Sequence, residues 1–393
     1  MLNHAGKSRV RLGFVTATDP LDRWSFSGTH SMMLTSLREE FEQVDSLGPF
    51  PLLRWQNAIG YRINGLCRNV FGKQYDFLHS SFASILQGRF FRSKAKKLGC
   101  QVLIAPAAST EIAFLGAGIP VIYSPDATFR QVRDLYPRFS DLLGGSAKEA
   151  DWIESRAIWR ARAVVVSSTW AMRSIVEDYG YDSHRVSLAS YGANLDEIPT
   201  REEVFRRLNR GSGECRILFL GVDWLRKGGE TAYRAWEELK RLGADVRLTV
   251  VGCDPPGLDP SVDIYPSLDK NDPAQERVLR SILLDTHFLL VPTRADCTPI
   301  AFSEAAAFGV PVYTCDVGGV ASVVLDGVSG RVLPLAATPS EFAKWILCDW
   351  NDPQRYETMV RRARLEYEQR LNWSVWAAKI RDLAESIQEG RLG

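Results

Sequence analysis

Short apolar runs alternate with longer helical patterns along the whole chain. Four runs in the first half are RLGFVTAT, QVLIAP, PVIYSP and AVVVSS, at residues 11–18, 101–106, 120–125 and 163–168. Near-continuous apolar runs of this length are typical of strands that are buried on both faces of a parallel sheet. Their alternation with helical segments predicts an α/β fold built from βαβ units.

The pattern breaks once and then resumes. Residues 196–213 are polar and end in Gly-Ser-Gly, after which apolar runs recur at residues 216–221, 246–252, 288–293 and 310–315. Residues 373–388 form an amphipathic helical pattern. We therefore predict two Rossmann-like, doubly wound domains in tandem, and we expect ligands at the carboxyl ends of their strands and in a cleft between them. The predicted parts are residues 1–195, the linker 196–213, residues 214–372 and the closing segment 373–393.

Composition narrows the class of protein. The chain is 45% hydrophobic and 24% charged, as ordinary globular proteins are, and its net charge of +1 argues against a nucleic-acid partner. Its seven cysteines form no C-x-x-C pair, which favours a reducing compartment over a disulfide framework. The sequence shows neither a signal-peptide pattern nor an apolar run of membrane-spanning length. A cytoplasmic protein is the expectation.

Two adjacent cations follow the first apolar run of the second half. That run ends at Gly221, and Arg226, Lys227 and two glycines then precede a helical pattern. Arginine offers a bidentate fork, lysine a point charge, and a helix N-terminus presents N–H groups, so together they suit a diphosphate. The alternative is a solvated pair on an exposed loop. The stretch is not a P-loop, because the chain contains no G-x-x-x-x-G-K-[ST].

Two carboxylates follow a later apolar run. Asp296 lies in the loop after the run at residues 288–293, and Glu304 comes eight residues later, in what we expect to be the first turn of an alanine-rich helix. Carboxylates accept paired hydrogen bonds from vicinal hydroxyls and could grip two parts of a sugar nucleotide. The alternatives are a charge that complements the helix dipole for Glu304, and a loop or capping residue for Asp296.

Residues 216–334 resemble the retaining glycosyltransferases of family four, the group 1 glycosyltransferases with the GT-B fold. DWLRKGG is similar to the family's arginine–lysine element, and DCTPIAFSE to its Glu-x7-Glu signature with Asp296 at the first position. GGVASVVLDGVSGRVLP, residues 318–334, also matches the family in residue types and spacing. The resemblance implies that Arg226 and Lys227 bind the donor diphosphate, Glu304 the nucleotide ribose and Asp296 the transferred sugar. Gly221 is a further donor-binding candidate.

The resemblance also implies backbone contacts and shows departures from the family. The amides of Cys297, Thr298 and Ile300 would approach the sugar or phosphate. Pro299 between them has no N–H, and the family's usual glycine-phenylalanine-glycine is missing, so sugar contacts are expected to differ.

The first half resembles the family more weakly. RWSFSGTHSMMLTSLRE, at residues 23–39, stands where such enzymes have a glycine loop and helix, which makes Gly28 and Thr29 donor-binding candidates. Many relatives have a histidine after the strand expected at 120–124, where this chain has SPDATF. Asp126 is then either a catalytic replacement for that histidine or the cap of a following helix.

The implied activity is retaining transfer of a hexose-type sugar from a nucleoside-diphosphate sugar to a glycan, lipid-linked or small-molecule acceptor. No cofactor is expected, and no metal, because the chain has no Asp-x-Asp and its five histidines show no ligand spacing. In the absence of a metal, Arg226 and Lys227 would stabilise the leaving diphosphate. Two alternatives are a non-catalytic sugar-nucleotide-binding subunit and another GT-B enzyme, such as a sugar-nucleotide epimerase.

Positive charge is concentrated in residues 51–100. This segment holds one acid, Asp76, and nine basic residues, Arg54, Arg62, Arg68, Lys73, Arg89, Arg92, Lys94, Lys96 and Lys97. With aromatic neighbours, such a segment suits a lipid-linked or phosphorylated acceptor, or peripheral contact with the inner face of a membrane. The alternative is a solvated face.

Overall fold

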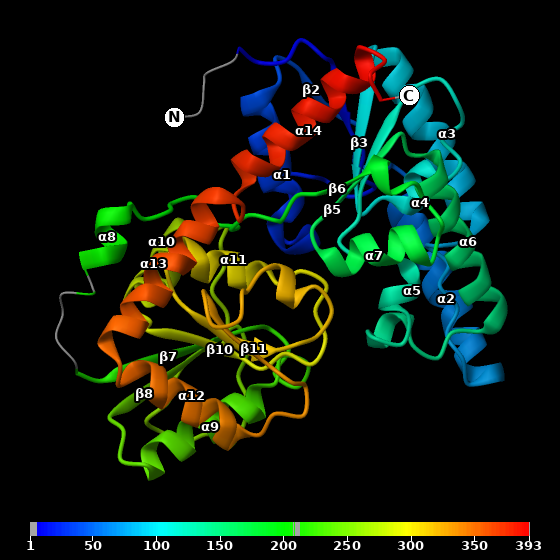
Figure 1. Ribbon diagram of the computed structural model, residues 1–393. Coiled ribbons are helices and arrows are strands. Elements are labelled where there is room, and N and C mark those ends of the chain that lie inside the picture. The colour runs from blue at the N-terminus through cyan, green and yellow to red at the C-terminus, as the bar shows by residue number, and fades with distance from the viewer. Residues whose placement is uncertain (1–5, 207, 209–212, 393) are drawn as a thin grey trace. The chain divides into compact units, whose positions relative to one another are not determined.

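The computed structural model describes residues 6–206, 208 and 213–392, which form two compact units (Figure 1). Unit 1 consists of residues 1–189 and 373–393, and unit 2 of residues 190–372. The segment expected as a linker, 196–213, falls in unit 2, and its residues 207 and 209–212 lie outside the described residues. Each unit is an α/β layer structure around one parallel sheet, so the predicted fold class is confirmed.

The sheet of unit 1 has six parallel strands in the order β2-β1-β3-β4-β5-β6. The strands are β1 (Leu12–Phe14), β2 (Val44–Ser46), β3 (Val102–Pro106), β4 (Val121–Ser124), β5 (Ala163–Val166) and β6 (Val186–Leu188). The four apolar runs of the first half form β1, β3, β4 and β5, each fully buried. The edge strands β2 and β6 were not predicted, because they are short and partly exposed.

Helices cover the sheet of unit 1, and the last of them comes from the end of the chain. They are α1 (Thr29–Glu40), α2 (Leu53–Phe71), α3 (Ser81–Leu98), α4 (Ser109–Ile112), α5 (Phe129–Val132), α6 (Gly144–Arg160), α7 (Thr169–Glu177) and α14 (Trp373–Gln388). Helix α14 lies beside α1 (Figure 1), where Arg381 pairs with Glu40 and the apolar face containing Trp376 and Ile380 is buried. Among the described residues, no helix has an apolar stretch that could cross a bilayer.

The sheet of unit 2 also has six parallel strands, in the order β12-β11-β10-β7-β8-β9. The strands are β7 (Cys215–Leu220), β8 (Val246–Val251), β9 (Asp263–Tyr265), β10 (Phe288–Val291), β11 (Val312–Cys315) and β12 (Gly330–Leu333). The helices are α8 (Arg201–Arg206), α9 (Gly229–Arg241), α10 (Pro273–Asp285), α11 (Ile300–Ala307), α12 (Pro339–Trp350) and α13 (Pro353–Gln369). The four apolar runs of the second half form β7, β8, β10 and β11.

Each sheet reverses its strand order once. In unit 1 the chain leaves β1 for β2 at the edge and returns to β3 on the other side of β1. In unit 2 it leaves β7 for β8 and β9 and returns to β10 on the other side of β7. Adjacent loops diverge at such a switch point and leave a crevice at the carboxyl ends of the strands, where ligands bind in folds of this kind. The loops after β7 and β10 therefore flank the predicted site of unit 2.

Candidate functional site

The turn after β7 is shaped by two glycines that approach other parts of the unit. Gly228 has a φ of +74°, and a Cβ there would lie 2.0 Å from the carbonyl oxygen of Pro292 in the loop after β10. A Cβ on Gly229 would lie 2.1 Å from the ring of Trp224. Both positions therefore require glycine for reasons of packing inside the fold. As a result, the turn that carries the two cations lies directly against the loop that carries Asp296.

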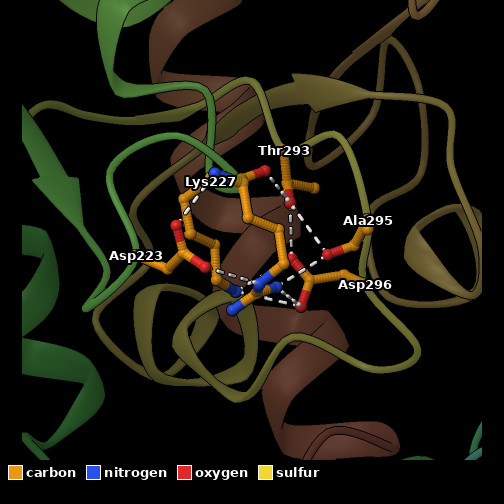
Figure 2. A network of polar contacts seen from close by, with 6 residues as sticks. Asp223, Lys227, Thr293, Ala295 and Asp296 are labelled. Atoms are coloured by element: carbon orange, nitrogen blue, oxygen red, sulfur yellow. Dashed lines mark hydrogen bonds and ion pairs between the residues drawn. The ribbon is translucent and has the colours of Figure 1, made fainter. Parts of the chain in front are cut away.

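The side chains of this switch point form one network of polar contacts (Figure 2). The ammonium of Lys227 donates to both carboxylate oxygens of Asp296, at 2.9 and 2.8 Å. Nη1 of Arg226 donates to the carbonyl of Ala295 at 2.7 Å and lies 3.4 Å from Asp296 Oδ1. The hydroxyl of Thr293 donates to Asp296 Oδ2 at 2.7 Å. The structure thus brings Arg226, Lys227 and Asp296 together, although they lie some seventy residues apart in sequence.

Burial and a second carboxylate define the electrostatics of the network. The side chains of Lys227 and Asp296 are 12% and 9% exposed, and that of Arg226 is 22% exposed. Asp223 accepts a hydrogen bond from the backbone N–H of Arg226 at 3.0 Å and lies 3.4 Å from its guanidinium. Two cations therefore face two carboxylates. The cations are held in place before any ligand arrives, and the alternative of a solvated surface pair does not describe them.

Gly221, the last residue before this turn, makes room for one of the cations. A Cβ on Gly221 would lie 2.9 Å from Cγ of Lys227. The lysine stem therefore passes over the backbone of Gly221 on its way to Asp296. Gly221, predicted as a donor-binding residue, has this packing role in the structure.

Glu304 lies deeper than expected. Helix α11 begins at Ile300, so Glu304 is its fifth residue and not part of the first turn. The proposed role as a charge that complements the helix dipole is therefore wrong. The Glu304 side chain is 2% exposed, and its carboxylate pairs with Lys270 from the segment between β9 and α10. Lys270 was missed, because nothing in the sequence connects two residues 34 positions apart.

The three residues whose amides were singled out lie between Asp296 and Glu304. Cys297 and Thr298 belong to the loop before α11, and Ile300 is the first residue of that helix, whose N-cap is Pro299. The first N–H groups of a helix have no partner within it, so the start of α11 at Ile300 is the part of this segment suited to present donors. Pro299 has no backbone N–H, so no donor is available at that position.

The candidates of the first half lie in unit 1. Gly28 is the N-cap of α1 with a φ of +79°, and Thr29 is its first residue and is buried. His30 stacks on the ring of Phe26 at a centroid distance of 4.8 Å, and burial lowers its pKa to about 4. Asp126 precedes α5, but the cap of that helix is a capping box formed by Thr128. The alternative that Asp126 caps the helix is therefore wrong.

Unit 1 also contains buried carboxyl groups that were not predicted. Glu111, in α4 after β3, accepts a hydrogen bond from the backbone N–H of Ala17 at 3.0 Å, and burial raises its pKa. Glu154, in α6, accepts a hydrogen bond from the hydroxyl of Tyr123 at 2.9 Å, and burial raises its pKa to about 7. Acidic residues within helical segments are normally exposed, so their sequence positions gave no signal.

Among the described residues, no group of three or more His, Cys, Asp or Glu side chains is arranged to hold a metal ion. Metal independence of the reaction remains a prediction.

Known proteins resemble this chain in sequence and in fold. The family model of glycosyl transferases group 1 matches residues 214–352. The D-inositol 3-phosphate glycosyltransferase of Corynebacterium aurimucosum is 25% identical over 284 residues, which are 67% of this chain and 66% of that protein. This chain thus spans about two thirds of the length of that curated relative.

Solved structures show the same fold at low sequence identity. Sucrose-phosphate synthase from Thermosynechococcus elongatus has a TM-score of 0.68 at 14% identity, covering 98% of this chain and 100% of that one. The Anabaena protein Alr3699/HepE, solved in complex with UDP-glucose, has a TM-score of 0.60 at 14% identity, with the same coverage. Residues 214–352 thus match the group 1 glycosyl transferase domain, and the chain has the GT-B fold of these solved structures.

Proposed function

We propose that the protein transfers a hexose-type sugar from a nucleoside-diphosphate sugar to a glycan, lipid-linked or small-molecule acceptor, with retention at the anomeric carbon and without a bound metal. The observation that carries this proposal is the network of Arg226, Lys227 and Asp296 at the switch point of the group 1 domain. The UDP-glucose bound to a structural neighbour supports this class of donor.

The proposed reaction uses the contacts of this network in a fixed order. As the bond from the anomeric carbon to the diphosphate breaks, negative charge grows on the leaving group, and the fixed cations of Arg226 and Lys227 stabilise it. An incoming diphosphate competes with Asp296 for Lys227, because the ammonium already donates to both oxygens of that carboxylate. Once Lys227 turns to the phosphate, the Asp296 carboxylate is able to accept hydrogen bonds from sugar hydroxyls. Asp296 therefore binds Lys227 before the donor arrives and binds the sugar once the donor is in place.

Glu304 and Lys270 act in the same way on the nucleotide. A buried carboxylate with a lysine partner is held in one orientation, which suits paired hydrogen bonds from the ribose hydroxyls. Asp126 remains a proposed residue of the sugar or acceptor side. The excess of positive charge in residues 51–100 supports an anionic or lipid-linked acceptor and peripheral membrane contact.

The direct test measures donor binding and transfer separately. A thermal-shift panel of nucleoside-diphosphate sugars identifies the donor, because a ligand that binds only the folded state raises its stability. Labelled donor and candidate acceptors then report product formation, with and without excess chelator. We expect acceptor-dependent transfer that survives the chelator.

Other results of these assays would support a different function or overturn the proposal. Donor binding without turnover would indicate the non-catalytic subunit, and a new sugar nucleotide without acceptor would indicate an epimerase. Activity that is lost with chelator and restored by magnesium or manganese would overturn the metal-independent mechanism. No binding by any sugar nucleotide would overturn the proposal as a whole.

A further inference from the structure

Helix α2 is unusual within unit 1, because most of its surface faces outward. Of its 19 residues only Gln56 and Gly60 are buried, whereas the 18-residue α3 buries six. Tyr61 is 83% exposed and Leu66 63% exposed. Other large hydrophobic side chains exposed on or next to this helix are Leu52, Trp55, Val70 and Phe71. A single monomeric surface rarely exposes so many apolar side chains together without a partner for them.

The packing of α2 determines which side of the helix is available. Gln87 of α3 donates to Gln56 at 2.8 Å, and a Cβ on Gly60 would lie 2.9 Å from Phe77, so this side of the helix contacts the unit. Asn64, one turn later on the same side, accepts from the backbone N–H of Tyr75 at 2.9 Å. The rest of the helix is left for another surface.

Four of the exposed apolar residues form a row along the helix, whereas Tyr61 and Phe71 lie on other sides of it. Leu52, Trp55, Leu66 and Val70 are separated by three, eleven and four residues, which places them on one side of an α-helix. Arg62 lies seven residues after Trp55 and therefore in the same row. The row is thus apolar with a cation in it, the arrangement of helices that lie in the headgroup region of a bilayer.

The charge of α2 favours a lipid partner over a second copy of the chain. Arg54, Arg62 and Arg68 of α2 are exposed, and residues 47–75 contain no aspartate or glutamate. In a symmetric dimer the same surface faces itself, so these arginines would oppose one another without an acid from this stretch to compensate them. An anionic lipid surface instead supplies both the negative charge and the apolar layer.

We propose that the α2 surface, defined as Leu52, Trp55, Leu66 and Val70 with Arg62 in the same row and the exposed Arg54 on the neighbouring side of the helix, docks the protein on an anionic lipid membrane. The membrane contact expected of the basic segment 51–100 is thereby assigned to one helix, α2. Lys94 of α3, by contrast, donates to the backbone carbonyls of Leu47 and Gly48, at 2.9 and 3.4 Å, and is committed within the unit. Docking does not require the proposed transfer reaction and is measured without any sugar donor.

The test is sedimentation of the full chain with vesicles of pure phosphatidylcholine and of an equal mixture with phosphatidylglycerol, over a range of salt concentrations. We expect binding only to the mixed vesicles, and weaker binding as salt rises. Reversal of Arg54 and Arg62 to glutamate should weaken binding at least about 25-fold, because each cation near the surface contributes about a fivefold change. Trp55→Ser with Leu66→Ser should weaken it at least about tenfold while leaving the charge unchanged.

The matched control is Lys96→Glu with Lys97→Glu, which makes the same charge change on α3. We expect it to retain most of the binding, and equal loss in this control would overturn the assignment to α2. Binding that ignores lipid charge, or that is unaffected by the serine variant, would also overturn it. A dimer in solution that the serine variant dissociates, without vesicle binding by the parent chain, would assign the surface to a second copy. Circular dichroism and unchanged nucleotide binding confirm that each variant is folded.

Discussion

In unit 1 the carboxylate of Glu111 follows β3 and accepts a hydrogen bond from the backbone of Ala17, which follows β1. In unit 2 the carboxylate of Asp296 follows β10 and accepts hydrogen bonds from Lys227, which follows β7. The two residues occupy equivalent places, because β1 with β3 and β7 with β10 are the strand pairs at which each sheet reverses its order. A carboxylate bridges each switch point, but its partner is an uncharged amide in one unit and an ammonium in the other.

The difference determines what each switch point can do. Burial raises the pKa of Glu111, and its carboxyl group connects two loops through the backbone of Ala17. Asp296 and Lys227 instead form a charged pair, supported by Arg226 and Thr293. An ion pair offers a cation to an anionic ligand, whereas the bridge between Glu111 and the backbone of Ala17 contains no cation. The fold thus repeats the bridge, and the bridge of unit 2 is the one that contains cations.

The largest expected effect is that of removing the cation from the charged bridge. Lys227→Met leaves Asp296 buried without its main partner, so we expect the free energy of unfolding to fall by about 3 kcal/mol or more. Adding Asp296→Asn to the same variant should restore most of that loss, because the remaining group is uncharged. Urea unfolding of both variants measures this. The exposed Lys240→Met is the control and should change little. If Lys227→Met were as stable as the parent chain, the bridge would not be a charged one.

A second test concerns binding of the leaving group. Arg226→Ala should weaken binding of the free nucleoside diphosphate by about 1.5 to 3 kcal/mol, the usual contribution of a charge-assisted hydrogen bond. Calorimetric titration gives the affinity. Arg234→Ala, on the exposed face of α9, is the matched control and should bind normally. Equal affinity of the Arg226 variant and the parent chain would show that Arg226 does not bind the diphosphate.

The two carboxylates of unit 2 should differ in their kinetic effects. We expect Asp296→Asn to lower kcat by about tenfold or more (~1.4 kcal/mol) while binding of the free diphosphate is unchanged or tighter, because Asp296 competes for Lys227. Glu304→Gln should instead weaken nucleotide binding, by about 1 kcal/mol, through loss of a charged acceptor for the ribose. Initial rates and nucleotide titrations separate the two. If Asp296→Asn weakened diphosphate binding as Arg226→Ala does, the proposed exchange of partners would be wrong.

The smallest expected effect belongs to the bridge of unit 1, which contains no cation. Glu111→Gln keeps an oxygen that can accept from the backbone of Ala17, so at acidic pH we expect a change in stability below about 1 kcal/mol. The folded pKa of Glu111 is raised, so its contribution is complete below the unfolded pKa and is lost as the pH rises through the folded one. The variant should therefore lose less stability than the parent chain between acidic and neutral pH. Thermal unfolding across this range measures it, and an identical slope in both proteins would contradict a raised pKa.

The centre of each sheet was predictable, and its edges were not. Strands β3 and β10 are buried on both faces, so their residues are apolar without interruption and stand out in the sequence. Strands β2 and β9 have three residues each and are partly exposed, and they contain aspartate. Their position depends on pairing with a neighbouring strand, which local composition does not record.

The site was predictable by residue type but not by contact. Arg226, Lys227, Asp296 and Glu304 stood out, because cations or carboxylates follow buried strands and match a known motif. The pairing of Lys227 with Asp296 depends on the adjacency of β7 and β10, and that adjacency is a property of the sheet order. Lys270 came from a loop without any pattern, so only the folded chain connects it to Glu304.

The position of α14 after unit 2 in the chain affects the order in which the two units can fold during synthesis. The helix belongs to unit 1, where Arg381 pairs with Glu40 of α1 and the side-chain amide of Gln388 donates to the backbone of Gln101, yet it follows all of unit 2 in the chain. A ribosome therefore completes every residue of unit 2 before it supplies the helix that covers α1. Domains generally fold as units during synthesis, so unit 2 can close while the first 189 residues still wait for their last helix. The early half of this polypeptide is then the late half to fold, and the apolar face of α1 is the surface that a chaperone would meet on the nascent chain.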